Sequence, residues 1–275
     1  MEERRGINRV DYRVKSVIVT CDTFEKFYVD AINVSPLGMG LLAPAGTPNL
    51  VGRQIIIVAD TMIMYAQTYS IVLAILVGFI CAGIFADDFQ TKADAVFFAS
   101  KYGRSKAIKT KILAGVVATS MIYWTGIVLL SAISFGIMGT SGMHTPYQMA
   151  EAYSIYIMTY GQYYALTVAC GYIASLLAAS LAMLVAAKMH TISVAVCIPF
   201  FLYCLLPFIG RALSGYTEVF NLIPTILTNV EASVRVPLLY QIGTHVIRQV
   251  PLVMVMYTVL SIVLLPLIYR SFRRY

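Results

Sequence analysis

Long uninterrupted runs of apolar residues dominate the pattern of hydrophobic and polar positions along the chain. A helix that crosses a bilayer needs about 20 mostly apolar residues, and five stretches qualify: residues 62–85, 112–138, 153–187, 191–210 and 250–269. Backbone groups in lipid must be hydrogen-bonded within the protein, and these runs are too continuous for the strands of a membrane barrel. The pattern predicts an all-α membrane protein, a polytopic bundle with five transmembrane helices.

The third stretch is too long for a single helix that stands perpendicular to the membrane. Either Gly161 and Gln162 break it, or the helix tilts to fit the longer apolar segment into the bilayer. The fourth stretch carries Pro199 and Pro207, and the fifth has prolines near each end.

The segment before the first span lacks a comparable apolar run. Its first apolar run, residues 17–20, is far too short for a signal peptide, and residues 35–52 are rich in Gly and Pro and predict a loop. We expect a polar, loop-rich N-terminal region over residues 1–54, outside the membrane or on its surface. A transmembrane domain is expected over residues 55–275.

Composition excludes whole classes of protein. Charged residues make up 12% of the 275 residues, whereas an average soluble domain has about a quarter. Too few polar side chains remain to cover a soluble fold, which excludes a soluble enzyme, a nucleic-acid-binding domain and a disordered chain. The five cysteines form no CxxC pair and four lie in apolar runs, which favours small core residues over a disulfide or metal site.

The net charge of +7 is explained by where the basic residues lie. Loop 86–111 is rich in Lys and Arg, the turn between the third and fourth spans holds Lys188, and the C-terminus is basic from Arg270 onward. By the positive-inside rule these segments, including the C-terminus, are cytoplasmic. Residues 1–60 would then lie outside. Three explanations are open: these residues insert into the membrane without a signal, they lie on the membrane surface, or a further span precedes them. We favour the further span.

Sequence motifs for catalysis or nucleotide binding are absent. The chain has no GxxxxGK[ST] phosphate loop, no HExxH metal pattern and no GxSxG nucleophile turn. The spans carry no Asp, Glu, Lys or Arg at mid-membrane, where ion-coupled transporters keep ionisable groups. We predict no catalytic residue, cofactor or metal ligand. If the chain transports a molecule, another subunit must supply the energy.

Loop 86–111 is the strongest candidate for a docking site. Acidic residues are favourable near a helix start, so residues 87–89 predict the beginning of a short helix, which continues through apolar residues 96–98. The pattern breaks at residues 102–103 and resumes with basic residues. It fits an amphipathic helix, a glycine turn and a basic re-entry helix; the alternative is a basic loop with an interfacial helix. The candidate site residues are Asp87, Asp88, Phe89, Val96, Phe97, Phe98, Ser100, Tyr102, Gly103, Arg104 and Lys106.

Two residue patterns in the third span suggest further contacts. Small residues let helices pack closely in lipid, so an alanine row either packs within the chain or forms a seam with a second subunit. Tyrosines near the outer end either anchor the helix at the interface or line a path for an amphipathic cargo. The alanine row is Ala174, Ala178, Ala182 and Ala186, and the tyrosines are Tyr156, Tyr160, Tyr163 and Tyr164.

The loop also resembles part of a known family. Its sequence FADDFQTKADAVFFASKYGRSKAIKTKILAG is similar to the region after the second span of type-2 ABC exporter permeases, the ABC-2 family. These have an acidic residue past the membrane, a coupling helix and a serine–x–x–glycine–basic turn, which Asp88, Ser100, Gly103 and Arg104 match. The chain from Tyr240 onward resembles their last span in Gram-positive bacteria. The similarity covers about residues 55–275.

The resemblance implies six spans, of which the five found here would be the second to the sixth, with residues 211–249 as an extracellular insertion. It implies a permease subunit of an ATP-driven exporter in a bacterial plasma membrane, paired with a second permease subunit. A separate ATPase subunit would contact loop 86–111, and Lys188 and His190 would form a second coupling turn. The alternative is a non-transporting membrane protein, an assembly factor or sensor, whose basic loop binds anionic lipid.

Overall fold

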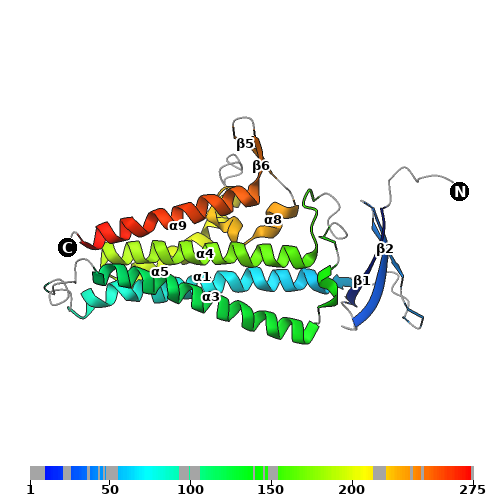
Figure 1. The fold of residues 1–275 in the computed structure, drawn as a ribbon, viewed down its shortest axis with the longest axis horizontal. Coiled ribbons are helices and arrows are strands. Elements are labelled where there is room, and N and C mark those ends of the chain that lie inside the picture. Colours follow the sequence, from blue (N-terminus) through cyan, green and yellow to red (C-terminus); the bar gives the residue numbers. More distant parts are fainter. Residues whose placement is uncertain are drawn as a thin grey trace.

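The computed structural model of the chain describes residues 10–20, 26–35, 38–42, 44–45, 47, 55–92, 99, 106–138, 140–144, 146–147, 154–212, 221–235, 238–242 and 245–273. In this part of the chain, five helical segments are long and apolar enough to cross a membrane, which confirms the predicted polytopic α-helical bundle. They run side by side along the long axis of the molecule (Figure 1). The helices are α1 (Val58–Gln90), α3 (Ile108–Met138), α4 (Tyr160–Met189), α5 (Ile192–Phe200) with its continuation, and α9 (Gln249–Arg273).

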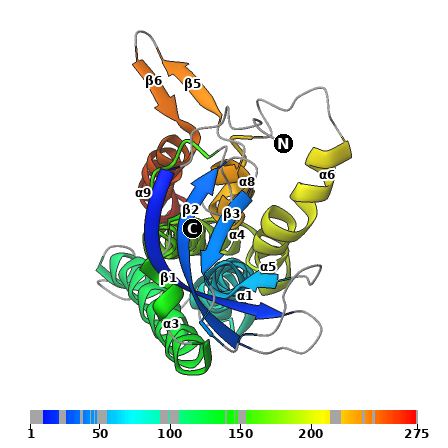
Figure 2. The same ribbon diagram turned by 90° about the vertical axis from the view of Figure 1, so that its right-hand side faces the viewer.

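Helix α4 is the central element of the bundle. It contacts α1, α3, α5 and α9, and it lies between them when the bundle is viewed from one end (Figure 2). Small side chains make this position possible, because α1 and α3 approach α4 closely at Gly171. A Cβ atom at Gly171 would overlap the hydroxyl groups of Ser70 in α1 and Tyr123 in α3.

The third span begins later than expected, and Gly161 and Gln162 do not break it. They lie in the first turn of α4, which begins at Tyr160 because Thr159 caps it. The Thr159 hydroxyl accepts a hydrogen bond from the Gln162 backbone N–H (3.3 Å), and the Gln162 side chain accepts one from the Thr159 N–H (3.1 Å). This reciprocal pair is a capping box, which fixes a helix start in place.

The fourth span is continuous but irregular. Helix α5 passes into a π-helical turn, η4 (Phe201–Leu205), and then into α6 (Leu206–Ala212). Pro199 inside α5 has no backbone N–H to donate, and π-helical turns are one way in which a helix accommodates such a gap. The Pro199 ring packs on α1 at Gly78, where a Cβ atom would lie 2.5 Å from the proline Cγ.

Shorter elements join the spans at the end of the bundle away from the C-terminus. Between α3 and α4 lies a short 3-10 helix, η2 (Ser141–His144). Between α6 and α9 come η6 (Pro224–Leu227), α8 (Val230–Arg235) and a hairpin of β5 (Leu239–Ile242) and β6 (His245–Arg248). The hairpin projects sideways from the bundle at the start of α9 (Figure 1).

The N-terminal region contains a sheet where a polar, loop-rich region was expected. Its strands are β1 (Val10–Thr20), β2 (Lys26–Ser35), β3 (Gly38–Leu42) and β4 (Ile55–Ile57), paired antiparallel in the order β3-β2-β1-β4. Strand β3 falls where a loop was expected. Val, Ile and Tyr are frequent in β1 and β2, and such residues favour strands. Strand β4 leads directly into α1, so the sheet lies at the opposite end of the bundle from the C-terminus (Figure 1).

Candidate functional site at the basic end of the bundle

Three chain segments that are far apart in sequence meet at one end of the bundle, which we call the basic end. They are the end of α1 with the start of α3, the turn between α4 and α5, and the end of α9 (Figure 1). These are the segments whose Lys and Arg residues predicted the cytoplasmic side. Exposed cations of the described residues surround this end: Lys92, Lys106, Lys109, Lys188 and Arg270.

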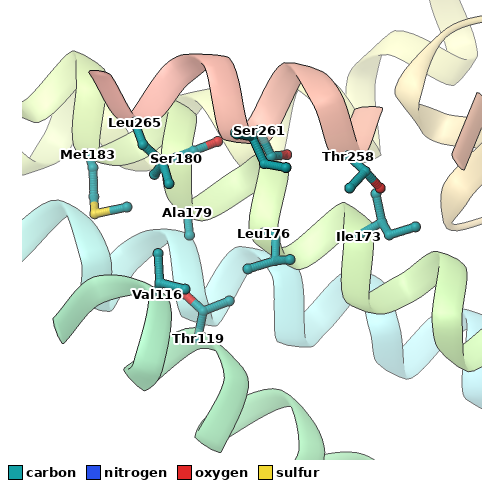
Figure 3. Close-up of a pocket in the computed structure, with 11 residues that line it drawn as sticks. Val116, Thr119, Ile173, Leu176, Ala179, Ser180, Met183, Thr258, Ser261 and Leu265 are labelled. Atoms are coloured by element: carbon teal, nitrogen blue, oxygen red, sulfur yellow. The ribbon is translucent and has the colours of Figure 1, made fainter. Parts of the chain in front are cut away.

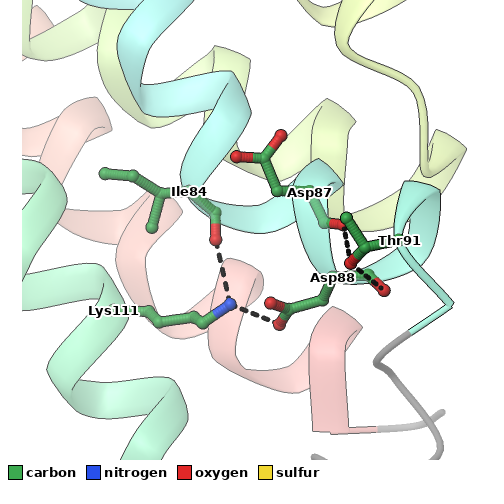
Figure 4. Close-up of polar contacts among 5 residues, drawn as sticks. All are labelled: Ile84, Asp87, Asp88, Thr91 and Lys111. Carbon is green, nitrogen blue, oxygen red and sulfur yellow. Dashed lines mark hydrogen bonds and ion pairs between the residues drawn. The ribbon is translucent and has the colours of Figure 1, made fainter.

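At the centre of the basic end, Lys111 of α3 forms an ion pair with Asp88 of α1 (Figure 4). The lysine Nζ also donates to the backbone carbonyl of Ile84 at 3.0 Å. Only 20% of the Lys111 side chain and 22% of the Asp88 side chain are exposed. A carboxylate near the C-terminal end of a helix is unfavourable to the helix dipole, and a cation there is favourable. Lys111 therefore neutralises Asp88 and stabilises the end of α1.

Aromatic rings surround the same ammonium group and bring α9 into the contact. The Lys111 Nζ lies 5.9 Å from the ring centre of Phe85 in α1 and 5.8 Å from that of Phe272 in α9. The two rings meet edge to face at 5.1 Å, and both are fully buried. A cation within about 6 Å of an aromatic ring is attracted to its face. One lysine thus links the ends of α1, α3 and α9.

The turn after α4 packs against this cluster through Phe89 and His190. Their rings are stacked with centres 3.7 Å apart, and Phe89 also contacts Phe272 at 5.5 Å. His190 has a left-handed backbone (φ 57°), and its N–H donates to the carbonyl of Ala186 at 3.0 Å, which ends α4. The predicted second coupling turn therefore contacts α1 through His190, while Lys188 is exposed.

The structure corrects the expected start of the coupling helix. Asp87, Asp88 and Phe89 are the last turn of α1, not the first turn of a separate helix. The helix continues to this point because Thr91 donates to the carbonyl of Asp87 through both its N–H (2.9 Å) and its hydroxyl (2.7 Å) (Figure 4). Lys92 then leaves the helical path with φ 56°. The other predicted residues of the loop, Val96, Phe97, Phe98, Ser100, Tyr102, Gly103 and Arg104, lie outside the described residues.

Sequence reasoning missed the residue that organises the site. The sequence marks Lys111 only as one of several basic residues in the loop, Phe85 as the last apolar residue of the first span, and Phe272 as part of the basic C-terminal segment. The sequence does contain one indication of its role: Lys111 is the last charged residue before the uncharged stretch of α3. A lysine at such a depth is expected to find a partner.

The tyrosines expected in the third span are mostly buried, and Tyr156 precedes α4 rather than lying in it. Tyr160 and Tyr163 are fully buried and Tyr156 is 7% exposed, in one cluster with Tyr147. Tyr164 is half-buried and its hydroxyl contacts that of Ser131 in α3 at 2.8 Å. These positions favour a packing role within one chain over the lining of a cargo path.

The alanine row is likewise buried within the chain. Ala174, Ala178, Ala182 and Ala186 all have no exposed surface, and they pack in clusters that include Ala74 and Ala82 of α1. The row therefore lets α1 approach α4 in the same chain, which was one of the two interpretations of its spacing.

No group of three His, Cys, Asp or Glu residues in the described part of the chain is placed to hold a metal ion. Comparison of the chain with known protein families, with curated proteins and with solved structures gives no match. A functional proposal therefore depends on the residues and contacts described above.

Proposed function

We propose that the chain is the membrane subunit of an ATP-driven exporter of the type-2 ABC class, which works with a second permease subunit and a separate ATPase. The observation that carries the proposal is the contact of four helix ends: Asp88 and Phe89 of α1, Lys111 of α3, His190 after α4 and Phe272 of α9. A permease driven by an external ATPase needs a place where one docking event reaches several spans at once. The resemblance of loop 86–111 to the coupling segment of that family supports the same assignment.

In the proposed mechanism, the ATPase binds residues 93–105 between the two helix ends that Lys111 and Asp88 hold together. A displacement of this segment would move α1 and α3 jointly because the ion pair connects them. Phe89 and Phe272 would pass the movement to the turn after α4 and to α9. Closure of two ATPases would thus tilt the spans of two facing permeases and change the side from which a cargo path is open.

The test is purification of the chain in mild detergent from its native host, followed by identification of bound proteins and measurement of ATP hydrolysis. We expect an ABC ATPase to co-purify and cargo export to depend on ATP. Phe97→Asp and Gly103→Pro in the docking segment should abolish export. Ile157→Asp, which places the same charge on a residue 92% exposed near the start of α4, should leave export unchanged.

The alternative, a non-transporting membrane protein with a basic lipid-binding loop, predicts different results. No ATPase would co-purify, and a peptide of residues 86–111 would bind vesicles that contain anionic phospholipid and dissociate at high salt, since salt screens such attraction. Absence of an ATPase partner together with unchanged function in Phe97→Asp would overturn the exporter proposal.

A further inference from the structure

A lateral pocket lies halfway along the bundle between α3 and α9, with α4 as its floor (Figure 3). Val116 and Thr119 of α3 form one wall, and Thr258, Ser261, Ile262 and Leu265 of α9 form the other. Its volume is about 170 Å³. The floor extends along α4 from Ile173 to Met183, near the middle of that helix, so the pocket lies at mid-membrane depth if α4 spans the bilayer.

The pocket reaches from the outer surface of the bundle to its core. At its mouth, Ile262 is 60% exposed, and its neighbour Val263 on α9 is also exposed. At its floor, Ala179 and Met183 are buried, with 2% and 1% of their surface exposed. A molecule in the surrounding bilayer can therefore enter from the side without crossing either membrane surface.

The pocket walls present only apolar groups, although four lining residues carry a hydroxyl. Each hydroxyl donates to a carbonyl of its own helix: Thr119 to Gly115 (2.7 Å), Ser180 to Leu177 (2.9 Å), Thr258 to Met254 (2.7 Å) and Ser261 to Tyr257 (2.8 Å). A buried water needs two to four polar partners, and an apolar cavity of about 150 Å³ stays dry and takes benzene. The pocket thus offers neither a water site nor a headgroup site.

The depth and the lining of the pocket select its occupant. At mid-membrane depth the surrounding medium is hydrocarbon. Walls that present only apolar groups match a flexible hydrocarbon chain that enters between α3 and α9 from the bilayer. We propose that the lateral pocket binds one acyl chain of a membrane phospholipid, with the headgroup remaining in the bilayer. The bound acyl chain lies between α3 and α9, away from the contact of Lys111 with Phe272 that joins the two helices at the basic end. Binding of the acyl chain does not depend on the proposed exporter function.

The test is photolabelling of the full chain in nanodiscs made with phosphatidylcholine that carries a diazirine near the middle of one acyl chain. After irradiation and digestion, mass spectrometry locates the adducts. We expect adducts on Ala179 and Met183 at the floor, in addition to those on exposed residues such as Val263. Ser180→Leu, which fills the floor and removes a hydroxyl bonded only within its helix, should abolish the floor adducts. Val263→Leu on the outer face of α9 is the matched control and should keep them.

Thr258→Leu narrows the pocket from the opposite wall and guards against a folding defect in Ser180→Leu. Two results would overturn the proposal: adducts confined to outward-facing residues, or floor adducts that persist in both pocket variants. Floor adducts that appear in the monomer but not in a dimeric fraction would also overturn it, because side chains of a second copy would then occupy the pocket.

Discussion

The basic end and the sheet-bearing end of the bundle are held together by different kinds of contact. At the basic end a single charged residue, Lys111, joins α3 to α1 and α9. Toward the other end, neutral hydroxyl groups join α3 to α4: Tyr123 donates to the carbonyl of Val168 at 2.7 Å, and Tyr164 contacts Ser131 at 2.8 Å.

The two ends therefore differ in how many contacts share the stabilising free energy: one ion pair at the basic end, and several neutral hydrogen bonds toward the other end. A charged pair of low exposure is costly to break because the remaining charge is left without a partner. Neutral hydrogen bonds between membrane helices contribute little each, about 0.6 kcal/mol on average. We therefore expect the basic end to respond sharply to one substitution and the other end to respond weakly to many.

The largest effect is expected for Lys111→Met, which leaves Asp88 unpaired beside the end of α1. We expect a loss of stability of about 2–3 kcal/mol, less than for a fully buried pair because both side chains keep some exposure. Cys81 reports the local change, since its Sγ lies 3.5 Å from the Thr119 hydroxyl between α1 and α3. N-ethylmaleimide should modify Cys81 faster in the variant, whereas Cys170 on α4, 1% exposed, should stay protected.

Lys109→Met is the matched control for Lys111→Met, because Lys109 is exposed two positions earlier on the same helix. Equal Cys81 reactivity in the two variants would mean that general charge at the basic end, not the Asp88–Lys111 pair, holds α1 and α3 together. Lys111→Arg should retain most of the protection.

The next largest effect is expected at Gly171, where α1, α3 and α4 meet. Gly171→Ala places a methyl group against the Ser70 side chain and the hydroxyl of Tyr123, and overpacking of this kind costs about 1–3 kcal/mol. Gly136→Ala on α3 is the control, since nothing lies within 4 Å of its Cβ position. That change should stabilise the helix by up to about 1 kcal/mol. The unfolding temperatures of the two variants in detergent measure these effects. Similar changes of unfolding temperature in Gly171→Ala and Gly136→Ala would contradict the close packing at Gly171.

A smaller effect is expected for Tyr123→Phe, which removes the neutral hydrogen bond to the Val168 carbonyl and a long contact with the Ser70 hydroxyl (3.4 Å), and keeps the ring. We expect a loss of about 0.6 kcal/mol, the average for such bonds in a membrane helix bundle, measured by thermal unfolding. A loss as large as that of Lys111→Met would show that the two ends do not differ in how their contacts are distributed.

The smallest effect is expected at Tyr156, outside the spans at the sheet-bearing end. Burial raises the pKa of its hydroxyl above the ordinary value of 10.0, although Arg248, 5.2 Å from the ring centre, opposes the shift. The unfolded chain therefore releases this proton at lower pH than the folded chain, so stability from this group is complete below pH 10 and decreases as the pH rises through the raised pKa. Unfolding temperatures measured up to pH 11 should decrease slightly less in Tyr156→Phe; an equal decrease would contradict the assignment.

The spans were predictable because their signal is local. Each apolar run is about as long as a bilayer is thick, so the runs alone place five helices to within a few residues, except for the start of α4 at Tyr160. The sheet was missed because its strands are shorter than any span and their partners lie in other segments. The pairing of Val17 with Tyr28, for example, cannot be read from either strand alone.

The sequence by itself determined the class of the protein, the number of spans described here and the segments in which its basic residues collect. Only the tertiary structure decided which residues act together, because contacts across the bundle are set by helix packing rather than by spacing in the chain. Asp88 and Lys111 lie on different helices, and their pairing depends on how α1 and α3 cross. In the same way, the alanine row of α4 predicted close packing, and the fold determined that its partner is α1.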